Sequence, residues 1–332
     1  MKSGKVQWGV LAPSGIAGRF VPDLKQVKGA EVVAVASREA KRAAAFAKNH
    51  GIAKSYGSYL ELVKNPDIDV VYISSVHTHH YAHAKLALEH GKGVLLEKPF
   101  TINYRQAAEL VELARKNKLF LMEAMWTRCY PLLLEMAEVV KRGDIGDVTM
   151  VRASLGPIGL PRGFRALDPN LGGGALLECG VYPLNFAYHI LGKPERFEAW
   201  AHFTPKGIDD AMSIILGYKD GVTATLATSI LEGLWSGLTS SAFISGTKGW
   251  IDVPTDVFAP NKFTLWRDDG GEALTREVPA IGNGYSYEAE EATAAVAAGK
   301  TESKLVPLDD TLELMRLMDA IRAQVGLRYA ED

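Results

Sequence analysis

Short apolar runs rich in β-branched residues recur along the first 125 residues, separated by amphipathic or alanine-rich stretches. The runs predict strands at 5–11, 31–36, 69–74, 93–96 and 118–123. The stretches between them predict helices from the turn at 12–14 to about Lys25 and at 39–49, 81–90 and 104–116. Apolar strands that alternate with helices are typical of a doubly wound parallel sheet, whose ligands bind at the carboxyl ends of the strands.

The pattern changes after about residue 145, where runs and turns follow one another closely. It predicts a large, open, mostly antiparallel sheet with strands at 147–154, 196–203, 211–218, 222–230, 240–245, 262–267 and 273–278. Helices expected at 176–191, 285–298 and 308–325 would cover one face. Several of these strands are apolar at most positions, so a second copy of the chain could cover the other face. The fold class is therefore α/β: a Rossmann sheet followed by an α+β domain.

Composition narrows the function classes. The 332 residues are 47% hydrophobic and 23% charged with a net charge of −2, so a disordered chain, a nucleic-acid binder and a membrane-surface binder are disfavoured. No apolar run reaches the roughly 18 residues of a membrane span, and MKSGK at 1–5 shows no signal-peptide pattern. Cys129 and Cys179 are too few for a disulfide scaffold, which favours the cytoplasm.

A small-residue turn follows the first predicted strand, where Rossmann folds carry G-x-G-x-x-G. It reads APSGIAG at 12–18, with Ala12, Ser14 and Ala17 in the three glycine positions. Small residues there let backbone N–H groups approach a pyrophosphate at the N-terminus of the next helix. The alternative is a turn that binds nothing, and its position between a strand and a helix favours the nucleotide site.

The second predicted strand ends on basic residues. NAD enzymes usually place a carboxylate at this end for the ribose, whereas Glu31 stands at the beginning of the strand. Ser37 and Arg38 stand at its end, and Lys41 and Arg42 follow one helical turn later. Because a guanidinium can pair with a 2′-phosphate, the sequence favours NADP(H) over NAD(H). The alternative is a solvated basic start of a helix.

Two segments carry residues suited to proton transfer. Lys98 follows the strand at 93–96, where its ammonium could lower the pKa of a neighbouring acid or polarise a substrate oxygen. Glu178, Tyr182 and Asn185 are spaced i, i+4 and i+7, so on a helix they share one face. Three glycines at 172–174 would let the backbone approach a ligand just ahead of them. The alternatives are an exposed loop lysine and polar groups that face solvent.

The histidines and cysteines suggest no metal site. His77, His79, His80 and His83 lie across a strand-to-helix turn that would point them in different directions, without a carboxylate or thiol nearby. The two cysteines are most simply read as small buried residues.

Several motifs together carry a family resemblance. WGVL at 8–11, VASR at 35–38, HTHH at 77–80 and EKP at 97–99 resemble the glucose–fructose oxidoreductase/inositol dehydrogenase (Gfo/Idh/MocA) family along essentially the whole chain. Further motifs resemble its branch of dimeric dihydrodiol dehydrogenases and NADP-dependent D-xylose dehydrogenases: MEAMWTR at 122–128, DPNLGGG at 168–174, GYSYE at 284–288 and PLDD at 307–310.

The resemblance implies an NADP-binding domain over 1–125 and a substrate-binding and dimerisation domain over 126–332, with the helix at 308–325 able to pack back on the first domain. It implies Lys98 and Tyr182 as the catalytic pair, joined by Glu178. Implied substrate contacts are Trp126, Arg128, Asp168 and Asn185. Implied cofactor contacts are Ala12, Pro13, Ser14, Gly15, Ile16, Ser37, Arg38, Ser75, His77, His80, Glu97, Lys98, Trp126, Arg128 and Tyr285.

The expected reaction is hydride transfer between nicotinamide C4 and a hydroxyl-bearing carbon of an aldose, a sugar derivative or a cyclic trans-diol. Tyr182 would take or return the hydroxyl proton, with its pKa lowered by Lys98. Two alternatives remain: an NADP-responsive regulatory protein, which would need neither residue, and a sugar–sugar oxidoreductase with tightly held cofactor.

Overall fold

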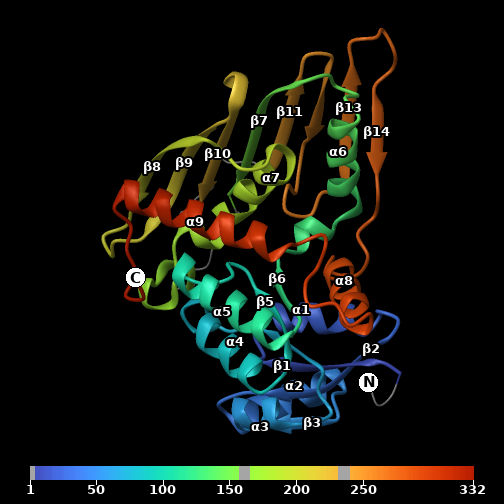
Figure 1. Ribbon diagram of the computed structural model, residues 1–332, viewed down its shortest axis with the longest axis vertical. Helices are drawn as coiled ribbons and strands as arrows, with labels where there is room; N and C mark the ends of the chain where they lie inside the picture. Colours follow the sequence, from blue (N-terminus) through green and yellow to red (C-terminus); the bar gives the residue numbers. More distant parts are fainter. Residues whose placement is uncertain (1–3, 157–164, 231–239) are drawn as a thin grey trace. The chain divides into compact units, whose positions relative to one another are not determined.

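The computed structural model describes residues 4–156, 165–230 and 240–332. The first three residues of the N-terminal segment MKSGK, in which the sequence analysis found no signal-peptide pattern, lie outside the described residues. The chain divides into two compact units (Figure 1). The first unit comprises Met1–Cys129 and Ala280–Met315, and the second comprises Tyr130–Pro279 and Arg316–Asp332. Residues 280–315 therefore belong to the first unit. The sequence analysis expected a single boundary between residues 125 and 126 and did not separate this segment from the second domain.

The first unit contains a six-stranded parallel sheet in the order β3-β2-β1-β4-β5-β6. This order confirms the predicted doubly wound Rossmann fold, in which the strand sequence reverses between β1 and β4. The strands are β1 Val6–Leu11, β2 Ala30–Ala36, β3 Lys54–Tyr56, β4 Val70–Ile73, β5 Gly93–Glu97 and β6 Leu121–Ala124. Every residue of β4 and β5 is buried, as expected for strands covered on both faces.

The helices of this unit are α1 Gly15–Leu24, α2 Ala40–His50, α3 Tyr59–Lys64, α4 His80–Glu89, α5 Tyr104–Asn117 and α8 Ser286–Ala297. The sequence pattern missed β3 and α3, because a three-residue polar strand and a six-residue helix carry too few apolar positions to show a period. The strand predicted at 118–123 begins later, at Leu121. Lys118 instead ends α5 in the left-handed conformation, with φ of 53°.

The second unit contains an eight-stranded sheet in the order β14-β13-β12-β11-β7-β10-β9-β8. Its pairs are antiparallel except for β7 with β10, which confirms a mostly antiparallel sheet. The strands are β7 Val148–Leu155, β8 Arg196–Phe203, β9 Asp209–Gly217, β10 Thr223–Ser229, β11 Ser241–Gly246, β12 Gly249–Val253, β13 Lys262–Arg267 and β14 Leu274–Glu277. Strand β12 was not predicted, because the sequence GWIDV offers only five residues between turns.

Helices α6 Pro131–Lys141 and α7 Val181–Leu191 belong to the second unit, and α9 spans Leu308–Val325. Helix α6 was also missed by the sequence analysis. Helix α7 packs against β7 and β10, where alternate residues of the strands are buried.

The opposite face of this sheet exposes large apolar side chains. Trp200, Ile215, Trp250 and Trp266 are between 39% and 61% exposed, although each lies within a strand. The strand register puts these four residues on one face, together with Arg152 and Phe243 in the middle of the sheet. The rings of Trp250 and Trp266 stack with centroids 5.6 Å apart. We call these six residues the open face.

Candidate active site

The turn between β1 and α1 has the backbone of a nucleotide loop despite its missing glycines. Ala12 adopts φ of 64°, the left-handed region that favours glycine. Its N–H donates to the carbonyl of Ala36 (3.1 Å) and its carbonyl accepts from the Ser74 hydroxyl (2.8 Å), which together hold this conformation. The hydroxyl of Ser14 caps α1 by accepting from the N–H of Ala17.

The start of α1 is open toward a ligand. Gly15 and Ile16 form the first turn of the helix, and no described atom lies within 4 Å of where a Cβ of Gly15 would stand. Unpaired N–H groups at a helix N-terminus and an open approach suit a phosphate group. The residues present therefore fit the pyrophosphate of a dinucleotide.

The carboxyl end of β2 carries the expected basic side chain. Arg38 is exposed, and Ser37 is buried with its hydroxyl accepting from the N–H of Glu39. The guanidinium of Arg42 donates to the carbonyl of Pro13 (2.9 Å), so it ties α2 to the phosphate loop. Glu31 lies at the opposite end of the strand, where it accepts from the side chain of Gln7.

The turns after β4 and β5 are joined by His80, which is fully buried. Its Nδ1 lies 2.8 Å from the carbonyl of Pro99 and its Nε2 lies 3.0 Å from the carbonyl of Ser75. The buried carboxylate of Glu97 accepts from the Tyr72 hydroxyl (2.5 Å) and from the N–H of Lys98 (3.2 Å). Burial, followed by the charge of Glu97, raises the pKa of Tyr72. These contacts fix the backbone that presents Lys98 at the carboxyl end of β5.

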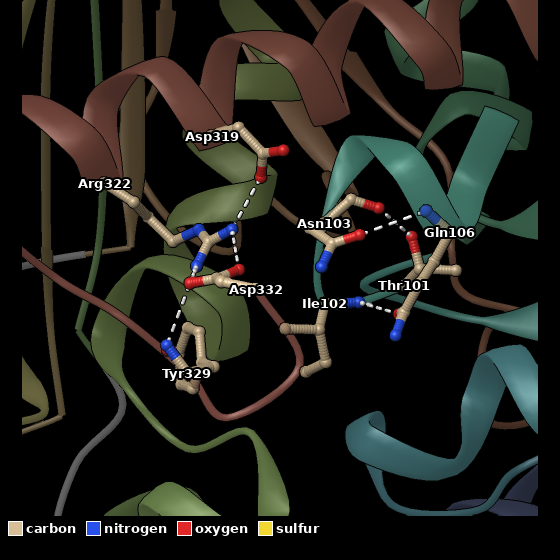
Figure 2. A network of polar contacts seen from close by, with 8 residues as sticks. All are labelled: Thr101, Ile102, Asn103, Gln106, Asp319, Arg322, Tyr329 and Asp332. Atoms are coloured by element: carbon tan, nitrogen blue, oxygen red, sulfur yellow. Dashed lines mark hydrogen bonds and ion pairs between the residues drawn. The ribbon is translucent and has the colours of Figure 1, made fainter.

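A polar network continues this turn into α5 (Figure 2). The hydroxyl of Thr101 donates to the carbonyl of Asn103, and the side chain of Asn103 caps α5 by accepting from the N–H of Gln106 (3.0 Å). The amide oxygen of Gln106 accepts in return from the N–H of Ile102. The chain that follows Lys98 is thus held by buried hydrogen bonds on both sides of a helix start.

Glu123 at the end of β6 is a buried carboxyl that the sequence analysis did not single out. It accepts from the N–H of Phe100 (3.1 Å) and from the hydroxyl of Thr311 (3.0 Å). Burial raises the pKa of Glu123 to about 7, against the opposing effects of Thr311, Phe100 and Arg128. It forms part of MEAMWTR, but nothing in one sequence marks a carboxyl as buried.

Trp126 and Tyr285, both expected to contact the cofactor, lie together in the first unit. Their rings stack with centroids 4.4 Å apart, and each residue is 7% exposed. Arg128, expected to contact ligands, is 5% exposed; its guanidinium pairs with Asp310 (2.7 Å) and donates to the carbonyl of Leu305 (3.2 Å). The pair links MEAMWTR at 122–128 to PLDD at 307–310.

Asp23 in α1 is a second residue that the sequence analysis missed. Its buried carboxylate accepts from the N–H groups of Asn283 (2.9 Å) and Tyr285 (2.9 Å) and from the side chain of Asn283. Gly282 adopts φ of 60°, and a Cβ there would stand 2.3 Å from the carboxylate. The segment before α8 is therefore clamped onto α1, which sets the position of the Tyr285 ring.

Glu178, Tyr182 and Asn185 lie in one segment of the second unit, whereas Trp126 and Arg128, also expected to contact the substrate, belong to the first unit. Leu176–Gly180 forms a π-helical turn that leads into α7, so the helix expected at 176–191 is not regular throughout. Tyr182 is 8% exposed and Asn185 is 2% exposed, which excludes polar groups that simply face solvent. The ring of Tyr182 lies 5.9 Å from that of Phe258, and the carboxylate of Glu178 pairs with Arg165 (3.0 Å).

The loop before this segment differs from expectation. The carboxylate of Asp168 caps its own turn, accepting from the backbone (3.0 Å) and side chain (3.2 Å) of Asn170. Two of the glycines that follow are required by protein packing, whatever their approach to a ligand. A Cβ at Gly173 would lie 2.4 Å from the carbonyl of Ala166, and Gly174 adopts φ of 127°.

Of the remaining histidines in the cluster, His77 is buried, and His79 and His83 are half-buried. His77 packs against His80, and burial first, then neighbouring His79, lowers the pKa of His83 to about 4. No cluster within residues 4–156, 165–230 and 240–332 has the makeup of a metal site. Cys129 and Cys179 are free and buried. Among these same ranges, no helix is long and apolar enough to cross a membrane.

Comparison with known proteins identifies the family of this chain. Residues 8–125 match the oxidoreductase family model with an NAD-binding Rossmann fold, and residues 133–252 match the GFO/IDH/MocA C-terminal domain. The chain belongs to the Gfo/Idh/MocA oxidoreductase family. It is therefore an oxidoreductase with a nicotinamide dinucleotide-binding domain, as the motifs indicated.

Among its relatives are two proteins named trans-1,2-dihydrobenzene-1,2-diol dehydrogenase. That of Xenopus tropicalis is 35% identical over 97% of this chain and 99% of its own, and that of Mus musculus is 35% identical over 98% and 99%. The structure is similar to KijD10, a 3-ketoreductase from Actinomadura kijaniata in complex with NADP and TDP-benzene. The TM-score is 0.85 at 29% identity, over 97% of this chain and 98% of that one.

Proposed function

We propose that this family member is an NADP-dependent oxidoreductase that transfers a hydride between nicotinamide C4 and a hydroxyl-bearing carbon. The proposed substrates are cyclic trans-diols, aldoses and sugar derivatives. The observation that carries the proposal is the end-to-end similarity to diol dehydrogenases in a chain that keeps Lys98 after β5 and Tyr182 at the start of α7. The solved NADP complex of a related ketoreductase supports the same reaction class.

The preference for NADP is proposed from the exposed Arg38 at the end of β2. A guanidinium there can form charge-assisted hydrogen bonds with a 2′-phosphate. Arg42 is occupied with the carbonyl of Pro13, so it supports the loop rather than offering all of its donors to a phosphate. Glu31 lies at the far end of the strand and would not reach a ribose bound at the carboxyl edge.

A bound nicotinamide supplies the hydride acceptor or donor, and the chain supplies the proton chemistry. During oxidation, the C–H electron pair leaves as hydride and the phenolate of Tyr182 takes the hydroxyl proton. Lys98 is proposed to assist this proton transfer with its positive charge. During reduction the same groups act in reverse. Glu178 keeps its pair with Arg165 and is proposed to accept a hydrogen bond from a second substrate hydroxyl.

A spectrophotometric screen tests the proposal. Trans-diols, D-xylose and related sugars would be offered with NADP and with NAD, and reduced nicotinamide would be followed by its absorbance. We expect turnover with NADP on one of these classes. Binding of NADP without turnover of any of them would favour the regulatory alternative. Cofactor that co-purifies and is reoxidised only by a second sugar would favour the sugar–sugar oxidoreductase.

We also propose that a second copy of the chain covers the open face. Three tryptophans and an isoleucine on one sheet face form an apolar surface of the kind that interfaces bury. Replacing Trp266 by Glu should convert the expected homodimer to a monomer in light-scattering measurements at equal concentration. The matched control is Leu60→Glu, which charges an equally exposed apolar residue on α3 of the first unit. A wild-type monomer at micromolar concentration would contradict the proposal.

A further inference from the structure

The π-helical turn Leu176–Gly180 stands immediately before Tyr182 and contains Glu178. The N–H of Val181 donates to the carbonyl of Leu176, five residues earlier, so one extra residue is accommodated at this point. Single π-turns are rare in proteins and occur often at functional sites. Because such a turn is held less well by its own hydrogen bonds than an α-helix, the neighbouring structure has to hold it in place.

Asp209, at the start of β9, holds the beginning of the turn. Its fully buried carboxylate accepts from the N–H of Leu176 at 2.7 Å. That N–H belongs to the first turn, where a helix offers no internal acceptor, so Asp209 acts as a cap contributed by another element. Burial raises the pKa of Asp209 to about 7, while the N–H of Leu176 and the charge of Arg322 oppose the rise.

Tyr329, in the segment after α9, holds the residues just ahead of the turn. Its hydroxyl donates to the carbonyl of Gly173 at 2.6 Å, and both groups are buried. The Tyr329 ring is in turn fixed by Arg322, whose guanidinium lies 5.2 Å from the ring centroid.

The ion pairs around Arg322 hold this segment (Figure 2). The guanidinium donates to both oxygens of Asp332 (2.9 and 3.0 Å) and to Asp319 (2.7 Å). Asp332 also accepts from the N–H of Tyr329 at 2.9 Å. The side chain of Arg322 is 4% exposed and its two carboxylate partners are half-buried, so these pairs are only partly open to solvent and help to position Tyr329.

Asp209 and Tyr329 meet at a single residue, Gly174. A Cβ on Gly174 would stand 2.2 Å from a carboxylate oxygen of Asp209 and 2.8 Å from the Tyr329 hydroxyl. Asp209 from β9 and Tyr329 from the segment after α9 therefore both lie against the backbone of Gly174, and only glycine fits between them. We propose that Asp209 and Tyr329 are positioning residues that lock 173–176 and thereby set where Glu178 and Tyr182 stand. The proposal rests on the proposed acid/base role of Tyr182.

The decisive variant is Tyr329→Phe, which removes one oxygen atom and keeps the ring over Arg322. Loss of one hydrogen bond removes only a small part of a protein's stability, so the variant is expected to fold. A displacement of about 1 Å in a catalytic group can lower a rate about 100-fold. We therefore expect kcat to fall by about tenfold or more, with the KM for NADP nearly unchanged because the proposed cofactor residues belong to the first unit. The pH profile of kcat should shift as well, since the surroundings of Tyr182 change.

Tyr218→Phe is the matched control. Tyr218 is a buried tyrosine of the same unit, and its hydroxyl has no hydrogen-bond partner among the described residues. A second pair, Asp209→Asn and Asp210→Asn, repeats the test on β9, where the Asp210 carboxylate pairs with His202 instead (2.6 Å). We expect Asp209→Asn to lower kcat and shift its pH profile, and Asp210→Asn to change neither.

The outcomes separate the two proposals. If Tyr182→Phe abolishes turnover while Tyr329→Phe and Asp209→Asn keep the kcat and pH profile of their controls, the positioning proposal is overturned and the proposed function stands. If Tyr182→Phe keeps full activity, the acid/base role fails first. Should Tyr329→Phe not fold, the Asp209 pair decides alone. Asp209→Asn keeps the size of the side chain, but a neutral amide, with one oxygen replaced by an NH2 group, holds the N–H of Leu176 less strongly than a carboxylate does.

Discussion

The buried carboxyl of Glu123 should make the stability of the protein depend on pH, with a sign and a size that follow from its pKa. Its pKa is raised from 4.5 to about 7 by burial, so the folded protein holds a proton that the unfolded chain releases between these values. The contribution of Glu123 to the free energy of unfolding therefore falls as the pH rises through that window. A rise of about 2.5 in the pKa corresponds to a loss of about 3 kcal/mol in the free energy of unfolding. This loss is complete only above about pH 7.

The perturbation that isolates this effect is Glu123→Gln, which keeps an oxygen for the N–H of Phe100 and cannot ionise. Denaturant unfolding of both proteins would be followed by circular dichroism at several values between about pH 4.5 and about pH 8. Across this range, the free energy of unfolding of the wild type should fall by about 3 kcal/mol relative to that of Glu123→Gln. Glu112→Gln, at an exposed position on α5, is the control and should show no such trend. A difference between wild type and Glu123→Gln that stays constant with pH would refute the reasoning.

Two further predictions concern the nucleotide loop. Arg38→Ala should raise the KM for NADP about tenfold or more, the size of a lost hydrogen bond to a charged group, and leave the KM for NAD nearly unchanged; equal effects in steady-state kinetics would contradict the assignment. Ala12→Val should destabilise the protein by about 1–2 kcal/mol, because a β-branched residue is strained at φ of 64°, whereas Ala12→Gly should be tolerated. Equal thermal unfolding of the Val and Gly variants would show that the left-handed turn is not formed.

The Rossmann unit could be predicted from the sequence because its strands are buried on both faces. The run at 69–74 is apolar almost throughout, and it forms β4, in which every residue is buried. Lys54–Tyr56 forms β3 without such a signal, since a short polar strand at the edge of the sheet depends on its neighbour rather than on its own composition.

The candidate site was less accessible to sequence reasoning. Motifs located Lys98, Trp126 and Tyr285, but the carboxylate that sets the Tyr285 backbone is Asp23, 262 residues earlier in the chain. A contact between such distant residues leaves no periodicity or spacing in one sequence. Residues 280–315 join the first unit for the same reason.

The glycines at 172–174 have a packing requirement that the sequence does not reveal. Their density suggested close approach of a ligand to the backbone. In the structure, Gly173 faces the carbonyl of Ala166, and Gly174 lies between Asp209 and Tyr329. The requirement is steric and comes from residues that the sequence analysis had not connected to this loop.

The central claim is that this chain transfers a hydride from a hydroxyl-bearing carbon to NADP with Tyr182 as the acid/base. Initial rates of NADP reduction on the best substrate of the screen, for the wild type, Tyr182→Phe and Tyr188→Phe, test it most directly. Tyr188 lies on the same helix, so its variant is the matched control. The account predicts a loss of about 10²–10⁴-fold in turnover for Tyr182→Phe alone. Wild-type turnover by Tyr182→Phe would contradict it.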